Sequence, residues 1–202
     1  GLELRCLAHY MKDKEYIHEV VNGDVHTANM KMAGLTNRDQ AKTFIYAFLY
    51  GAGPAKIGKV VGGGAAQGRQ LIESFLSNMP ALKRLRTQVT SAATQGSIKG
   101  LDGRWLQIRS EHAALNTLLQ GAGAIICKEW LVQMTKQINE MKLNVKLVGS
   151  IHDEYQFEVS IEDTPQFCKI TKQAILDTEK ILGVICPLDS EYKVGKTWAE
   201  TH

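Results

Sequence analysis

The sequence lacks an apolar run long enough to cross a membrane. No stretch of its 202 residues approaches the ~20 consecutive apolar residues that a transmembrane helix needs. It also lacks the basic segment followed by a long apolar core that marks a signal peptide. The first residue is not Met, and an amphipathic pattern already runs from position 2, so we expect the chain to begin in the middle of a structure. We therefore expect a cytoplasmic protein with no membrane partner.

Cysteine is scarce and widely spaced. There are four cysteines and no CxxC pair, so neither a zinc site nor a disulfide framework is indicated. Each lies among apolar neighbours, which predicts buried thiols in a reducing compartment. The four are Cys6, Cys127, Cys168 and Cys186.

Acidic residues are few in one part of the chain. The net charge is only +3, but residues 31–110 hold twelve Lys and Arg against three acids, a net charge of +9. An excess of this size indicates a polyanionic partner, for which nucleic acid is the usual candidate, although a basic face is often simply solvated. Apolar residues make up 44% of the chain, which is ordinary for a globular protein of one large or two small domains.

The first half of the chain reads as a series of helices. Residues 2–21 form an amphipathic pattern that ends at Asn22-Gly23. Residues 24–27 read as a connection into a helix over 28–33. Thr36 is then expected to cap a helix that runs to Tyr50. Two further helices are expected at about 66–77 and 81–94.

The second half mixes strands with helices. Residues 97–109 look like a small β unit around a turn at 101–104. A long helix is expected at about 111–141, interrupted by the small residues at 121–124. Period-2 alternation predicts strands around 143–147 and 155–159, flanking residues 151–154. A last helix over 164–182 and a strand-like tail at 198–202 complete the prediction.

Arg38, Lys42 and Tyr46 are spaced four apart on an expected helix. Successive members rotate by only ~40°, so the three form one ridge. Arg binds phosphate oxygens through two or more of its N–H groups, and Lys adds a point charge. The ring of a Tyr can stack on a base or sugar. The ridge is a candidate triphosphate contact. The alternative from spacing alone is a solvated charged face with Tyr46 in the core.

His152-Asp153-Glu154 stands at the tip of the expected hairpin. Hairpin tips usually favour Gly or Asn, whereas this one carries an imidazole and two acids. Carboxylates on rigid strands suit a hard cation such as Mg²⁺. The alternative is an exposed polar turn.

The order of these motifs resembles the family A DNA polymerases, and most closely the replicative polymerases of short-tailed bacteriophages. The resemblance covers essentially the whole chain. Residues 1–5 resemble the end of the first palm motif, and residues 38–51 match the fingers-helix motif RxxxKxxxYxxxYG. Residues 113–121 match the template-primer helix, His152-Asp153-Glu154 matches the second palm motif, and residues 197–202 resemble the family's C-terminus.

The resemblance implies template-directed DNA synthesis from deoxynucleoside triphosphates on primer-template DNA. Arg38 and Lys42 would bind the β- and γ-phosphates, with Lys42 also a general acid toward pyrophosphate, and His26 would lie nearby. Tyr46 would stack beside the nucleotide, and Glu3 would close off the ribose 2′ side. The residues that would contact the template or the minor groove are Tyr50, Gly51, Asn116 and Gln120, with His112 in a position where many relatives outside the phage group carry Arg.

By the same resemblance, Asp153 would bind the two catalytic Mg²⁺ ions, Glu154 would be a weaker partner, and His152 would lie near the primer terminus. The family's first palm motif begins with an Asp three residues before the position of Gly1, outside this chain. Because two-metal catalysis needs both carboxylates, we expect these residues not to polymerise alone. Either they are part of a longer protein, or the natural protein is split and a companion chain supplies the N-terminal segment.

The fold implied is α/β (α+β), an incomplete right-hand polymerase in which mostly helical fingers are inserted into an antiparallel-sheet palm. The expected division is palm over 1–25, fingers over 26–95 and palm over 96–202. Two alternatives remain: a fragment of a single-subunit RNA polymerase, or a non-catalytic DNA-binding remnant. Glu3 and the Glu154 that follows His152-Asp153 favour DNA synthesis over the first alternative.

Overall fold

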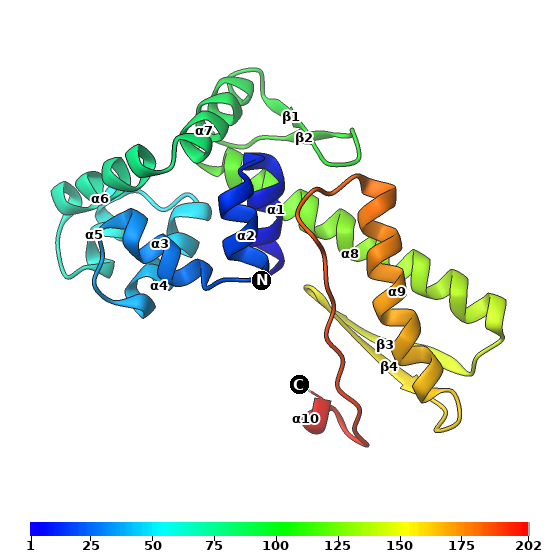
Figure 1. The fold of residues 1–202 in the computed structure, drawn as a ribbon. Helices are drawn as coiled ribbons and strands as arrows, with labels where there is room; N and C mark the ends of the chain where they lie inside the picture. The colour runs from blue at the N-terminus through cyan, green and yellow to red at the C-terminus, as the bar shows by residue number, and fades with distance from the viewer. Residues whose placement is uncertain (202) are drawn as a thin grey trace. The chain divides into compact units, whose positions relative to one another are not determined.

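The computed structural model describes residues 1–201 (Figure 1). The chain divides by its contacts into two compact units. Unit 1 comprises Gly1 and residues 3–121, and unit 2 comprises Leu2 and residues 122–202. The division falls inside one long helix, so it does not follow the expected palm and fingers boundaries, which remain a prediction.

Unit 1 is mostly helical. Its helices are α1 (Leu2–Met11), α2 (Lys14–Val21), α3 (Val25–Ala33), α4 (Arg38–Leu49), α5 (Pro54–Val60), α6 (Ala65–Asn78) and α7 (Pro80–Ala93). A hairpin of β1 (Ser97–Lys99) and β2 (Trp105–Gln107) follows, then the 3₁₀ turn η1 (Glu111–Ala113) and the start of α8 (Ala114–Met141). The expected helices at 66–77 and 81–94 and the β unit at 97–109 are confirmed.

The single helix expected over residues 2–21 is wrong. Lys12 takes a left-handed conformation with φ 54° and ends α1. Asp13 then caps α2, because its side chain accepts hydrogen bonds from the backbone N–H groups of Glu15 (3.0 Å) and Tyr16 (3.1 Å). The amphipathic pattern continues across this break, so hydrophobic periodicity alone did not reveal it, although an Asp in front of a helix is a strong start signal.

Two further helix starts differ from the prediction for the same reason. Asp24 caps α3, so Val25 and the residues after it belong to the helix and not to a connection. Asn37, and not Thr36, caps α4 by accepting from the N–H groups of Asp39 (2.9 Å) and Gln40 (3.0 Å). Asn is at least as good an N-cap as Thr, and here it stands next to the first helical residue.

The core of unit 1 is built on an aromatic cluster. The Phe44 and Phe75 rings are perpendicular with centroids 5.0 Å apart, and Phe48 meets Phe75 at 5.7 Å. Edge-to-face pairs of this kind are favourable beyond the area they bury. All three side chains are buried, and they join α4 to α6.

Close backbone approach joins α5 to α6. Gly58 and Gly68 are both buried, and a Cβ placed on Gly68 would lie 1.9 Å from the carbonyl oxygen of Pro54. Only glycine leaves room for two backbones at this distance. The packing therefore depends on the absence of a side chain.

Unit 2 holds the rest of α8, β3 (Val145–Ile151), β4 (Glu154–Val159), α9 (Thr164–Leu182) and α10 (Trp198–Thr201). The predicted bounds of α9 are confirmed. The expected interruption of α8 at 121–124 is wrong, since the helix runs through these residues. Glycine costs a helix only ~1 kcal/mol, and burial of Leu118, Ala122 and Ile126 on either side offsets that cost.

β3 and β4 form an antiparallel hairpin whose inner face packs on two helices. Met134 and Ile138 of α8 and Phe167, Ile170 and Ala174 of α9 make the buried centre. The rings of Phe157 and Phe167 lie edge to face at 4.8 Å. In β3 the register shifts at Val148, an extra residue between the pairs Leu147–Phe157 and Gly149–Gln156. Such a bulge bends and twists the strand.

The strand-like tail expected at 198–202 is wrong for the part that the structure describes. Residues 198–201 form α10, and His202 lies outside the described residues. Within residues 1–201 the strands pair only as β1–β2 and β3–β4, so the tail joins neither sheet. Cys6, Cys127 and Cys186 are buried as expected, whereas Cys168 is half-buried. No described helix is long and apolar enough to span a membrane.

We predict that Gly68→Ala lowers the stability of unit 1 by about 2 kcal/mol, because the added methyl group overlaps the Pro54 carbonyl and the two backbones must separate. Thermal unfolding followed by circular dichroism measures the change. Gly53→Ala is the matched control, since a Cβ there meets nothing within 4 Å and its φ of −71° suits any residue. Equal melting temperatures for the two variants would contradict the prediction.

Candidate functional site

The rotation of α4 places a polar ridge beside its buried side. Ala41, Phe44, Ile45, Phe48 and Leu49 are buried. Arg38 and Lys42 are exposed, and Tyr46 is half-buried. The ridge expected from the four-residue spacing is therefore present. No hydrogen bond or ion pair joins the side chain of Lys42 to another described residue, so its ammonium group is available to a ligand.

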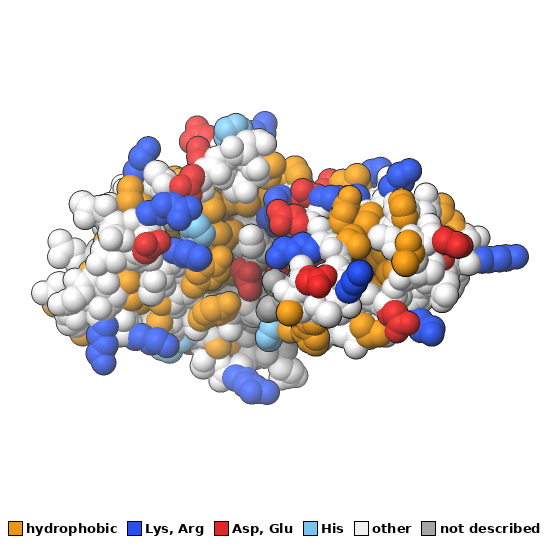
Figure 2. Space-filling view, turned by 90° about the horizontal axis from the view of Figure 1, so that it is seen from below, with side chains coloured by type: hydrophobic (Ala, Val, Ile, Leu, Met, Phe, Trp, Pro, Cys, Tyr) orange, Lys and Arg blue, Asp and Glu red, His pale blue; other side chains and the backbone are white. Residues whose placement is uncertain are grey.

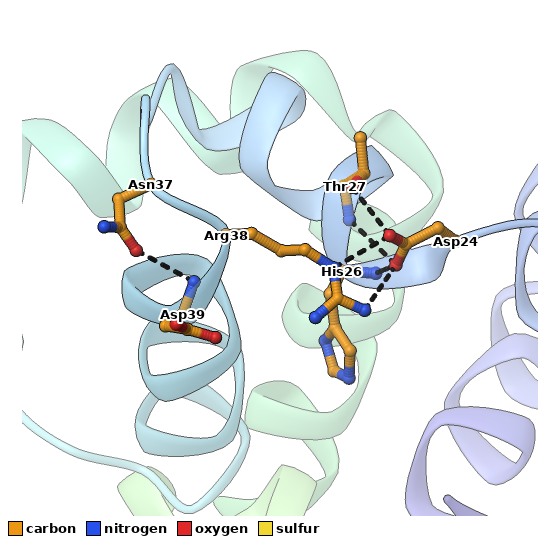
Figure 3. A network of polar contacts seen from close by, with 6 residues as sticks. All are labelled: Asp24, His26, Thr27, Asn37, Arg38 and Asp39. Carbon is orange, nitrogen blue, oxygen red and sulfur yellow. Dashed lines mark hydrogen bonds and ion pairs between the residues drawn. The ribbon is translucent and has the colours of Figure 1, made fainter.

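Arg38 is held by a carboxylate that the sequence reading missed (Figure 3). Its Nε donates to Oδ2 of Asp24 at 2.8 Å and its Nη2 donates to Oδ1 at 3.0 Å. The hydrogen bonds from Arg38, and next that from Thr27, hold the pKa of the Asp24 carboxyl well below its usual range. The same pair raises the pKa of Arg38.

His26 joins this group from the first turn of α3. Its ring centroid lies 6.2 Å from that of Tyr46. Burial, followed by the positive charges of Arg38 and Lys42, lowers the pKa of His26. The imidazole is thus kept neutral over a wider pH range, with one N–H to donate. Its Nδ1 is buried and has no hydrogen-bond partner among the residues described.

A second set of contacts ties α1 to the end of α4. The Tyr50 hydroxyl donates to Oε1 of Glu3 at 3.5 Å, and the rings of Tyr46 and Tyr50 stack with centroids 6.4 Å apart. A Cβ on Gly1 would lie 3.1 Å from the Tyr46 hydroxyl. Glu3, Tyr46 and Tyr50, three residues singled out from the sequence, are therefore neighbours in unit 1.

The residues expected at the template strand form a third set. Gly51 has φ 75°, and a Cβ there would lie 2.3 Å from the carbonyl oxygen of His112. Asn116 and Gln120 follow at one-turn intervals on the first turns of α8. His112 and Gln120 are exposed and Asn116 is half-buried, so these three present polar groups along one line.

Some of the positively charged side chains of residues 31–110 have partners nearby in the chain's own structure. Arg86 covers the Phe48 ring at 5.4 Å, and Arg104 pairs with Asp102 at 2.6 Å. On the face drawn in Figure 2, lysine and arginine side chains are spread among hydrophobic and acidic ones. Part of the basic excess therefore serves local packing, which weakens the inference drawn from charge alone.

The β3–β4 hairpin turns through His152 and Asp153. Ile151 pairs with Glu154, so His152 and Asp153 form the tip. The φ of His152 is 53°. Both are exposed. A positive φ at the first turn residue belongs to the primed turns, which match the twist of the flanking strands. No hydrogen bond or ion pair links the Asp153 carboxylate to another described residue.

The two acids at the tip differ in their surroundings. Glu154 is half-buried and accepts a hydrogen bond from the Gln156 amide on the same strand face. Within residues 1–201 no group of three or more His, Cys, Asp or Glu could hold a metal ion. The described residues therefore hold no complete set of His, Cys, Asp or Glu ligands in this arrangement. An exposed carboxylate on a rigid turn fits a hard cation whose other ligands come from substrate or another segment.

Comparison with known proteins decides among the families that share such features. The family model of DNA polymerase family A matches residues 1–200. The chain belongs to DNA polymerase family A. This confirms the resemblance drawn from the ordered motifs.

Similar proteins include the DNA-directed DNA polymerases of Enterobacteria phage T3, at 42% identity, and Escherichia phage T7, at 43%. Each comparison covers the whole of this chain but only 32% of the relative. A solved structure, the POL domain of Pol1 from M. smegmatis in complex with DNA primer-template and dNTP, shares the fold. Its TM-score is 0.78 at 21% identity, over 88% of this chain and 35% of that one. The fold-class prediction is confirmed.

Unit 1 brings together most of the residues that the sequence singled out. Contacts join Glu3 to Tyr50, Tyr50 to Tyr46 and Tyr46 to His26, and the charges of Arg38 and Lys42 act on His26. Asp153 and its neighbours belong to unit 2. The residue missed was Asp24. Its signal was an acid directly before a helical pattern, an N-cap arrangement that was taken for part of a connection.

We predict that His152→Gly stabilises the hairpin by about 0.5–1 kcal/mol, because glycine adopts a positive φ without the steric cost that His152 bears. His152→Ala, which removes the ring but keeps the Cβ, should bring no such gain. Hydrogen exchange of the β3 and β4 amides in the two variants measures the difference. Protection unchanged or weaker in the glycine variant would rule out backbone strain at this turn.

Proposed function

We propose that this chain forms the fingers and most of the palm of a template-directed DNA polymerase. It would take part in adding deoxynucleoside triphosphates to a primer 3′-hydroxyl. The observation that carries the proposal is the group on α4 and α3 in which the positive charges of Arg38 and Lys42 lie near enough to His26 to lower its pKa. Family membership supports DNA synthesis over RNA synthesis.

Nucleotide binding would fall to this group. Arg38 and Lys42 hold the β- and γ-phosphates, one by a fork of N–H donors and the other by a point charge. His26 donates its ring N–H to a phosphate oxygen. Lys42, which no described side chain engages, gives a proton to the departing pyrophosphate. Tyr46 stacks beside the nucleotide.

Selection of the sugar and placement of the template would depend on residues of α1, of the end of α4 and of the start of α8. Glu3, positioned by the hydroxyl of Tyr50 at 3.5 Å, closes off the ribose 2′ side. Tyr50 and Gly51 hold the template position. His112, Asn116 and Gln120 contact the minor groove, where the acceptors shared by all base pairs report shape without reading sequence.

Asp153 would carry the chemistry of the palm, with His152 near the primer terminus and Glu154 as a weaker partner. A pair of Mg²⁺ ions, when bound, would lower the pKa of the primer 3′-hydroxyl and neutralise charge on the pyrophosphate. Asp153 fits this task because it is exposed and no described residue pairs with it. The Asp that completes the ligand set would come from an N-terminal polymerase segment or a companion chain.

The phage polymerases that the chain resembles support a place of action in the cytoplasm of a bacterial host. We also keep the division into palm over 1–25, fingers over 26–95 and palm over 96–202 as a proposal. Both rest on the likeness to longer proteins, of which this chain spans about a third (32%).

We predict Mg²⁺-dependent primer extension when this chain is mixed with a segment that supplies the thumb and the first-motif Asp, and none by the chain alone. Asp153→Ala should abolish extension in the mixture, since no other described residue supplies an unengaged carboxylate at the hairpin tip. Gel analysis of a labelled primer measures both. Asp163→Ala is a control, because this acid bonds Asn144 and Ser160 at the far end of the hairpin.

Three other results would redirect the proposal. Extension by the chain alone would refute the need for a second carboxylate. Extension that survives Asp153→Ala would refute its role. DNA binding without extension in either preparation would favour a non-catalytic DNA-binding remnant.

A further inference from the structure

We propose that Asp24 is a positioning residue for the triphosphate, acting by fixing the guanidinium of Arg38. This inference rests on the proposed function, since it concerns the same phosphate group. The sequence motif that carries the family resemblance includes Arg38 but not Asp24, which lies fourteen residues earlier at the start of another helix.

The carboxylate of Asp24 is itself immobilised. Its Oδ1 accepts from the backbone N–H groups of His26 at 3.1 Å and Thr27 at 3.3 Å, and the Thr27 hydroxyl donates to Oδ2 at 2.8 Å. These three bonds are those of a helix N-cap, and they fix the side-chain torsions of Asp24. Asp24 therefore offers Arg38 a rigid anchor and not a mobile counter-charge.

The way Arg38 meets this anchor leaves its phosphate-binding edge open. Asp24 engages Nε and Nη2, the side of the guanidinium. A guanidinium carries five N–H donors in a fixed plane, so three remain for another acceptor. Figure 3 shows the imidazole of His26 beside the guanidinium. The three remaining N–H donors of Arg38 therefore lie near His26, next to the proposed position of the phosphates.

Half of the Arg38 side chain is exposed, so packing alone does not fix the position of its guanidinium. Its relative exposure is 50%, against 46% for Asp24. An arginine at such a position samples many rotamers unless something holds it, and ordering it on binding weakens affinity. The Asp24 pair removes that ordering step in advance, because the guanidinium is already in place.

Two other roles for Asp24 have different consequences. As a competitor, its negative charge would repel the triphosphate, and removing that charge would tighten binding. In a purely structural role, the Asp24–Arg38 pair would only hold the start of α3 to the start of α4. Its loss would lower the stability of the protein without a selective effect on the affinity for triphosphate. The five donors that already engage Asp24 argue against the competitor role.

The chain contains a matched control for the cap. Asp13 caps α2 through the same kind of contacts, to the N–H groups of Glu15 and Tyr16, and it forms no ion pair with another described residue. Asn and Ser cap helices as well as Asp does. Replacing Asp24 or Asp13 by either residue therefore keeps the cap, and only at Asp24 does it remove an arginine anchor.

The test is the affinity of this chain for inorganic tripolyphosphate and for deoxythymidine triphosphate, measured by calorimetric titration. We expect Asp24→Asn and Asp24→Ser to weaken binding of both by about 3- to 10-fold, and Asp13→Asn and Asp13→Ser to leave it unchanged. Arg38→Ala should weaken binding at least as much. In the Arg38→Ala background, Asp24→Asn should have no further effect, because the anchor has nothing left to hold.

Each other outcome overturns a distinct claim. If the unaltered chain binds neither ligand, the proposed triphosphate site fails and the role of Asp24 fails with it. If the chain binds, Arg38→Ala weakens binding and Asp24→Asn matches Asp13→Asn, only the positioning role is wrong. Tighter binding by Asp24→Asn, or an effect that persists without Arg38, would show that the carboxylate acts through its own charge. Melting temperatures of all variants identify a loss of affinity caused by unfolding.

Discussion

The rotation of α4 about its own axis is the constraint on which the candidate site depends. It is set by burial: Phe44 and Phe48 enter the aromatic cluster with Phe75 of α6. Because a helix is rigid, burying this side fixes the direction of every other side chain on it. The ridge of Arg38 and Lys42 is thus oriented by side chains that are buried in the core.

Helix caps supply a second level of order. Asp13, Asp24 and Asn37 each start a helix by accepting from free backbone N–H groups. Asp24 adds an arginine to that task, and so joins the start of α3 to the start of α4. Charged side chains elsewhere in unit 1 are also committed locally, as with Arg86 on Phe48 and Arg104 on Asp102. Fewer charged side chains of unit 1 are therefore left to bind a ligand, and packing and hydrogen bonds hold them in place.

Features that depend on a local sequence pattern were predicted. Two features were missed: the backbone conformation of one residue and a contact between side chains of two helices. The bounds of α9 follow from Thr164-Pro165 and the turn at Gly183, both local signals. The break at Lys12 interrupts a continuous amphipathic pattern, and only Asp13 hints at it. The ridge on α4 was predicted because helical spacing determines it. The Asp24 partner was not, because a contact between two helix starts leaves no periodic trace in the chain.

The two acids at the hairpin tip show why adjacency in sequence is not adjacency in space. Successive residues entering a strand point to opposite faces, so Glu154 turns to Gln156 while Asp153 stays at the tip, without a partner among the described residues. An exposed carboxylate in water costs little free energy to leave unpaired. The same group becomes costly once substrate excludes water, and a cation then compensates its charge. In unit 1 the guanidinium of Arg38 is paired with a carboxylate, whereas in unit 2 the Asp153 carboxylate has no hydrogen-bond or ion-pair partner among the described residues. The proposed need for a second acid has another source, since two metal ions need ligands beyond one carboxylate.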